Sequence, residues 1–147
     1  MNLIQKILLE AELDNKDEFD LNPIFQPNER AKQELERRKK EFKENLSKIK
    51  LGLKEINKAF ENKEWKSEQE EFFLKSFYNC KTKVNLKKYP NYIFITKNGK
   101  VIAYQDLKYK WFGIDYESIW EVFEDEFHWS YYETQSFMKT MLNKYFK

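Results

Sequence analysis

Cysteine, histidine, glycine and proline are all scarce in this 147-residue chain. It has one cysteine, Cys80, one histidine, His128, three glycines and three prolines. A single cysteine excludes a disulfide within the chain and gives no sign of an oxidising compartment. One cysteine and one histidine are also too few for a cysteine/histidine zinc site within one chain. We therefore expect no metal site of that type.

Long apolar runs and glycine-rich phosphate loops are missing as well. No stretch approaches the roughly 20 apolar residues that cross a bilayer. The first ten residues lack the basic start and continuous apolar run of a secretory signal. Neither GxGxxG nor GxxxxGKS/T occurs, so nucleotide-dependent chemistry is not expected. These absences predict a cytoplasmic protein with no membrane partner and no cofactor.

The sequence offers no recognisable catalytic set. His128 lies at a predicted helix end, where the helix dipole favours a histidine, and no nucleophile or orienting carboxylate can be assigned to it. Cys80 follows aromatic residues at helical spacing, a pattern typical of a buried and inert thiol. We therefore expect that the protein is not an enzyme and has no catalytic residues.

Aromatic residues and segregated charges are abundant instead. Aromatic residues make up 18% of the chain, which is more than a core of this size requires. Residues 75–110 carry nine lysines against one aspartate, whereas residues 111–138 carry seven acidic residues and no lysine or arginine. Neighbouring blocks of opposite charge favour association with a charged macromolecule.

Hydrophobic spacing divides the chain into three parts. Residues 1–27 hold a short helix over 2–13 and an irregular connection, and residues 28–66 form a long charged helix. Residues 67–147 form a compact α+β domain. From Phe42 to Phe60, apolar residues recur in steps of four and three, which is the pattern of a helix–helix seam. The seam is suited to a homodimer, but we favour packing within a monomer.

Capping signals place three helices in the third part. Residues 67–70 (Ser-Glu-Gln-Glu) form a capping box that opens a helix over 68–80. Asp115 is expected to cap the next helix, which carries a core stripe of Ile119, Trp120, Phe123 and Phe127. Residues 130–133 (Ser-Tyr-Tyr-Glu) form another capping box and open the last helix.

A β-hairpin is expected between these helices, because Asn98-Gly99 separates two apolar runs and favours a two-residue turn. A regular hairpin places Ile95 opposite Ile102 and Ile93 opposite Tyr104. Residues 109–112 and 82–86 are expected to add further strands. The predicted fold class is therefore α+β, with a long N-terminal helical arm or hairpin, a small antiparallel sheet of two to four strands, and two C-terminal helices.

The acidic block gives the leading functional hypothesis. The simplest explanation of the acidic block is a helix face exposed to solvent. No second motif supplies the other residues that a pair of catalytic carboxylates or a Mg²⁺ site would need. The block could also imitate a phosphate backbone and occupy a cationic protein groove. We therefore expect a non-enzymatic protein-binding module, such as a small mobile-element inhibitor of the anti-CRISPR kind that acts on a nucleic-acid-handling protein. Its predicted binding residues are Glu117, Glu121, Glu124 and Asp125.

Direct binding of RNA or DNA is the alternative. Lysines interleaved with aromatic rings can neutralise phosphates and stack on bases. Some of these lysines have a simpler explanation, since charged side chains protect the edges of a sheet from aggregation. The residues predicted to contact nucleic acid are Lys87, Lys88, Tyr92, Lys97, Lys100, Tyr104, Lys108 and Lys110.

Overall fold

A computed structural model describes residues 29–114 and 119–146 of the chain. The order of elements is α2 (Glu29–Glu61), α3 (Glu68–Phe77), β1 (Lys81–Asn85), β2 (Tyr89–Lys97), β3 (Lys100–Asp106), β4 (Trp111–Ile114), α4 (Glu121–Asp125) and α5 (Tyr131–Tyr145). The strands form one antiparallel sheet in the order β1-β2-β3-β4, which confirms the predicted α+β class. The expected 2–13 helix, the 14–27 connection and the Asp115 cap lie outside the described residues. Within those residues, no helix combines the length and apolar character needed to cross a membrane.

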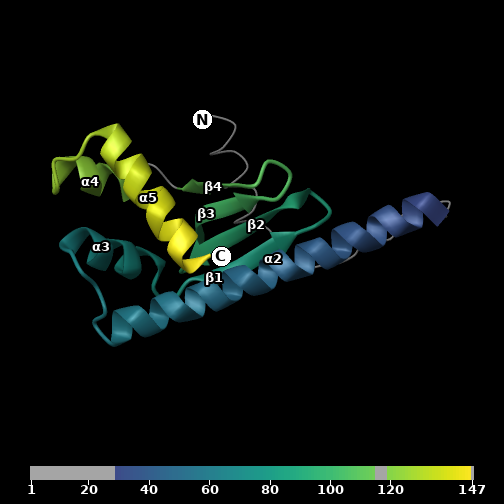
Figure 1. Ribbon diagram of the computed structural model, residues 1–147, viewed down its shortest axis with the longest axis horizontal. Helices are drawn as coiled ribbons and strands as arrows, with labels where there is room; N and C mark the ends of the chain where they lie inside the picture. Colours follow the sequence, from purple (N-terminus) through teal and green to yellow (C-terminus); the bar gives the residue numbers. More distant parts are fainter. Residues whose placement is uncertain (1–28, 115–118, 147) are drawn as a thin grey trace.

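The apolar seam of α2 faces the interior of the chain. Its buried residues form one core cluster with α3, α5 and one face of the sheet (Figure 1). The seam is thus covered by other parts of the same chain, which is the packing that we favoured from the sequence. The first turns of α2 extend past the sheet along the longest axis of the molecule (Figure 1). The buried positions of the helix are Phe42, Leu46, Ile49, Gly52, Leu53, Ile56 and Ala59.

The connection from α2 to α3 ends in the predicted cap. The Ser67 hydroxyl accepts a hydrogen bond from the Glu70 N–H at 3.2 Å. The Glu70 carboxylate reaches one residue further back than a regular capping box requires, and accepts from the Lys66 N–H at 3.0 Å. The predicted hydrogen bond to the Ser67 side chain is therefore confirmed. The Glu70 side chain binds the N–H of Lys66 and not that of Ser67.

Glu70 also ties α3 to α5, because Lys144 Nζ lies 2.9 Å from its Oε1. Burial by itself raises the pKa of Glu70, but the hydrogen bonds from Lys144 and the Lys66 N–H outweigh burial and lower it. A carboxyl group whose pKa is lower in the folded state stabilises the fold above its unfolded pKa. This contribution is present at neutral pH and is lost as the pH falls through the lowered pKa.

The β2–β3 hairpin turns at Asn98-Gly99 as predicted, but its register differs from a regular hairpin. Thr96 pairs with Val101, and a β-bulge then shifts the register, so that Ile95 pairs with Ala103 and Phe94 with Tyr104. The predicted pairs Ile95–Ile102 and Ile93–Tyr104 are therefore wrong. The bulge adds one residue to β3, which lets Ile102 and Ala103 both join the helix-side core and turns Tyr104 to the other face.

That other face of the sheet carries a second, aromatic cluster. Phe94, Val101 and Tyr104 are buried there, and Tyr89 and Tyr92 pack against them. The rings of Tyr92 and Phe94 are stacked, with centroids 6.0 Å apart. The high aromatic content of the sequence is thus divided between two faces of one sheet.

Residues with positive φ angles set several element boundaries. Tyr78 is already extended and Asn79 has φ 59°, so α3 ends at Phe77 rather than near residue 80. Lys110 has φ 56°, so β4 begins at Trp111 rather than at residue 109. β1 covers Lys81–Asn85, one residue earlier than predicted. A left-handed residue interrupts regular structure and allows the chain to change direction.

The two C-terminal helices follow the predicted pattern. Ile119, Trp120 and Phe123 are buried around α4, and Phe127 packs on the core. Both halves of the Ser130 capping box are present at the start of α5. Met138, Met141 and Leu142 form the buried stripe of α5.

Gly52 permits a close approach between α2 and the end of α5. A Cβ atom at this position would meet the ring of Phe146 and would lie 2.6 Å from the carbonyl oxygen of Tyr145. Glycine in the interior of an exposed helix costs about 1 kcal/mol against alanine. Here the missing side chain instead makes room for the last residues of the fold.

We predict that Gly52→Ala destabilises the protein by about 1–3 kcal/mol, because overpacking outweighs the gain in helix propensity. Urea unfolding monitored by circular dichroism measures the change. The control is Leu51→Ala at the neighbouring exposed position, which is expected to change stability by less than about 0.5 kcal/mol. A Gly52→Ala protein more stable than the parent would contradict the close contact.

Candidate nucleic-acid interface

The antiparallel sheet sorts the predicted lysines to its two ends. The β1–β2 turn (residues 86–88) and the β3–β4 turn (residues 107–110) lie at one end, and the Asn98-Gly99 turn lies at the other. Lys87, Lys88, Lys108 and Lys110 therefore share one end of the sheet, which also faces the first half of α2. We call this region, residues 29–43, 86–88 and 107–110, the basic end. Lys97 and Lys100 flank the turn at the opposite end.

Buried polar side chains fix both turns of the basic end. The Asn85 side-chain oxygen accepts from the Lys88 N–H at 3.1 Å. Asp106 Oδ1 accepts from the N–H groups of Lys108 and Tyr109 at 2.9 and 3.2 Å. Asn85 and Asp106 are both buried, so the side chains that bind the N–H groups of these turns lie in the protein interior. Such side-chain acceptors are characteristic of Asx turns and stabilise the backbone of the lysine-bearing loops.

A groove of about 290 Å³ lies between α2 and these turns. Its floor is largely apolar, with Leu35 and Phe42 from α2 and Leu86 and Leu107 from the turns. Its rim is mostly cationic, with one carboxylate; these charged residues are Arg37, Arg38, Lys39, Lys108 and Glu41. The groove thus combines an apolar base with positive charge supplied by two separate segments of the chain.

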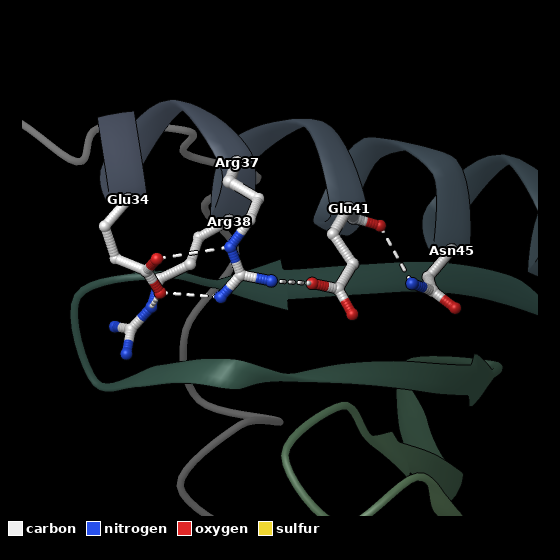
Figure 2. A network of polar contacts seen from close by, with 5 residues as sticks. All are labelled: Glu34, Arg37, Arg38, Glu41 and Asn45. Atoms are coloured by element: carbon white, nitrogen blue, oxygen red, sulfur yellow. Dashed lines mark hydrogen bonds and ion pairs between the residues drawn. The ribbon is translucent and has the colours of Figure 1, made fainter. Parts of the chain in front are cut away.

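An ion-pair network organises the α2 side of the groove (Figure 2). Arg37 Nη2 lies 2.6 Å from Glu34 Oε1, and Arg37 Nη1 lies 3.6 Å from Glu41 Oε2. Arg38 Nε is 3.4 Å from the same Glu34 oxygen. The hydrogen bonds from Arg37 lower the pKa of Glu34, and in return raise the pKa of Arg37. All these side chains are exposed, so each pair contributes little to stability.

The aromatic rings of the site are not those that the sequence singled out. Tyr104 is only 3% exposed and Tyr92 is half-buried, and both pack around Phe94. Burial, followed by the nearby Asp106, raises the pKa of Tyr92. The exposed rings beside the lysines are instead Tyr109 and Trp111, at 67% and 41% exposure. In the sequence, these two rings could have been found from their position on either side of Lys110. The groove residues Arg38 and Lys39 could have been found only from their charge.

Lys97 has an internal hydrogen-bond partner. Its Nζ donates to the carbonyl oxygen of Lys75 at 2.8 Å, in the last turn of α3. The same carbonyl also accepts the backbone N–H of Tyr78 at 3.3 Å, and a cation at a helix C-terminus is favoured by the helix dipole. This contact gives Lys97 a structural role, separate from any role in binding.

The predicted acidic residues lie far from the basic end. Glu121, Glu124 and Asp125 are exposed on α4, at the opposite end of the molecule from the first turns of α2 (Figure 1). Glu117 lies outside the described residues. His128 follows α4, as predicted for a helix end, and is exposed with φ 55°. The two candidate surfaces are therefore separate in space.

Cys80 is buried, and its Sγ lies 3.7 Å from the Ser76 carbonyl oxygen. Burial raises the pKa of the Cys80 thiol to about 11, although Lys97 opposes the shift. The thiol is therefore protonated at neutral pH, and a protonated thiol is a poor nucleophile. In the part of the chain that the structure describes, no group of three His, Cys, Asp or Glu residues could hold a metal ion.

Comparison with known proteins finds no matching family, curated protein or solved structure. Functional inference for this chain therefore rests on its own surface. At the basic end, cations from several segments meet on turns held by buried acceptors.

We predict that Asp106→Ala destabilises the protein by about 1–3 kcal/mol, because the N–H groups of Lys108 and Tyr109 lose their acceptor. Asp106→Asn keeps an oxygen at this position and is expected to cost less. Urea unfolding gives the stabilities, and hydrogen exchange of the Lys108 and Tyr109 amides reports on the turn. Equal protection of these amides in the alanine variant and the parent would contradict the anchoring role of Asp106.

Proposed function

We propose that this chain is a non-enzymatic binding protein that holds nucleic acid at its basic end. The observation that carries the proposal is the convergence of cations from α2, the β1–β2 turn and the β3–β4 turn at one end of the sheet. Sugar-phosphate backbones are recognised by positive side chains arranged along a path, and these contacts position the ligand without reading its sequence.

The fixed turns favour this function energetically. Asn85 and Asp106 hold the backbone at Lys88 and Lys108 before any ligand arrives. A preorganised loop loses less conformational entropy on binding than a loop that must first become ordered. The lysine side chains remain exposed on these turns, so phosphate oxygens can reach them.

The separation of charge along the molecule supports the same function. The acidic α4 lies at the end opposite to the basic end, so a polyanion is attracted to one end and repelled from the other (Figure 1). This arrangement orients an approaching nucleic acid although the net charge of the chain is only +2.

The test is a double charge reversal, Lys88→Glu with Lys108→Glu. Affinity for a labelled oligonucleotide is measured by fluorescence anisotropy at several salt concentrations. We expect weaker binding and a flatter salt dependence, by about 0.7–0.9 in the slope of log K against log salt for each phosphate that the variant no longer neutralises. The matched control reverses Lys54 and Lys58, two exposed lysines toward the other end of α2.

Equal losses of affinity in the two double variants would mean that overall charge, and not the basic end, governs binding. Salt-independent affinity of the parent protein would also count against phosphate contacts. Circular dichroism checks that each variant retains the fold, which is expected since all four lysines are exposed.

Binding of a cationic protein surface by α4 is the second candidate function. It is supported by the exposure of Glu121, Glu124 and Asp125 on the short helix α4 and of Glu126 directly after it. A compact anionic surface can occupy a groove that normally receives phosphates, and this would make the protein an inhibitor of a nucleic-acid-handling partner, as an anti-CRISPR-type protein is.

For this candidate, the three residues Glu121, Glu124 and Asp125 are changed to Gln, Gln and Asn. Tagged protein is used to capture partners from a lysate of the producing cell after nuclease treatment. If α4 binds a protein, the captured partner is lost with the neutralised helix and retained with Lys88→Glu/Lys108→Glu. Retention of the partner by both variants would exclude α4 as the binding surface.

A further inference from the structure

A second cavity, of about 380 Å³, opens between β4 and α5. We call it the aromatic pocket, because its walls include Trp111, Phe112, Trp120 and Tyr131. Pockets for small ligands measure about 300–1,000 Å³, so this volume lies near the lower end of that range. The pocket therefore has the size for one small planar group and not for a folded partner.

The rings of the pocket form a stacking platform. Tyr131 stacks on Trp120, with ring centroids 5.1 Å apart and an angle of 18° between the ring planes. Tyr131 remains 48% exposed, although Trp120 is buried beneath it. A ring that is already supported from one side loses little freedom when a planar ligand stacks on it. Flat aromatic ligands are thus the chemical class that this wall favours.

The β3–β4 turn contributes lysines both to the basic end and to the aromatic pocket. Lys110 belongs to the β3–β4 turn together with Lys108, and it also lines the aromatic pocket. Lys139 of α5 lines the pocket as well, and both lysines are exposed. Cations beside a stacking platform match the alternation of phosphate and base along a nucleic-acid strand.

Polar side chains complete the lining. Gln135 and Asn143 of α5 both line the pocket and are exposed. Their amides can donate to and accept from the edge of a base, as amide side chains do in nucleic-acid complexes. The pocket therefore offers stacking, hydrogen bonding and charge to one nucleotide.

From this arrangement we infer that the aromatic pocket takes an unpaired nucleobase, which makes single-stranded nucleic acid the preferred ligand. The inference rests on the proposed function, because the basic end must hold the backbone that brings the base to the pocket. Bases in a duplex are stacked and paired, so they cannot enter without being extruded. A free strand meets no such cost.

The experiment compares labelled single strands of about 12 nucleotides, as DNA and as RNA, with a duplex of equal length. Anisotropy titrations are made with the parent protein, Tyr131→Ala and Tyr132→Ala. Tyr132 is the matched control, since it is the next residue, is 80% exposed and does not line the pocket. Lys139→Glu is a second test that leaves the aromatic stack intact.

We expect the parent to prefer the single strand, and Tyr131→Ala to weaken that binding by about five- to hundred-fold, which is the range for losing one stacked base. Duplex binding and the salt dependence should not change in this variant, and Tyr132→Ala should bind like the parent. Lys139→Glu should weaken binding of the single strand and reduce its salt dependence.

Equal affinity for both forms, or equal behaviour of Tyr131→Ala and Tyr132→Ala, would overturn the assignment of the pocket while leaving the proposed function standing. Absence of salt-dependent binding to either form would overturn the proposed function and the pocket together. Weaker binding of Tyr131→Ala to the duplex as well as to the single strand would overturn the preference for an unpaired base.

Discussion

Burial of the apolar seam of α2 against the sheet is the interaction on which the rest of this structure depends. The seam residues join α3, α5 and the helix-side face of the sheet in one core cluster. Removing apolar surface from water contributes roughly 25 cal/mol per Å², and the seam buries seven positions of α2. Because α2 lies along the sheet, its charged first half is carried past the ends of the strands, where it meets the two lysine-bearing turns (Figure 1).

The candidate surface is thus a product of packing and not of one motif. Gly52 allows the end of α5 to approach α2, and α5 supplies one wall of the aromatic pocket. The buried acceptors Asn85 and Asp106 hold the turns of the basic end. Stability and binding therefore share a framework, in which interior residues fix the positions of exposed lysines and rings.

The fold separates the lysines of the basic block and keeps the carboxylates of α4 together. The basic block is divided, because an antiparallel hairpin sends Lys97 and Lys100 to one end of the sheet and Lys88 and Lys108 to the other. The acidic block supplies the exposed carboxylates of α4, since a single short helix displays them together. Residues adjacent along a helix remain neighbours, whereas residues along a hairpin are separated by the length of its strands.

Sequence alone determined the parts of this protein that depend on local interactions. The long helix, the Asn98-Gly99 turn, the serine caps and the core stripe of the last helices all follow from periodicity and from backbone preferences of a few residues. Three features depended on tertiary structure: the bulge that moved Tyr104 to the far face, the close contact at Gly52 and the partial burial of Tyr92. Each of these depends on volumes supplied by distant segments, and a pattern of neighbouring residues carries no information on such volumes. For the same reason, the lysines were evident from the sequence, while the groove that brings Lys108 together with Arg38 was decided only when the strands paired and α2 packed across them.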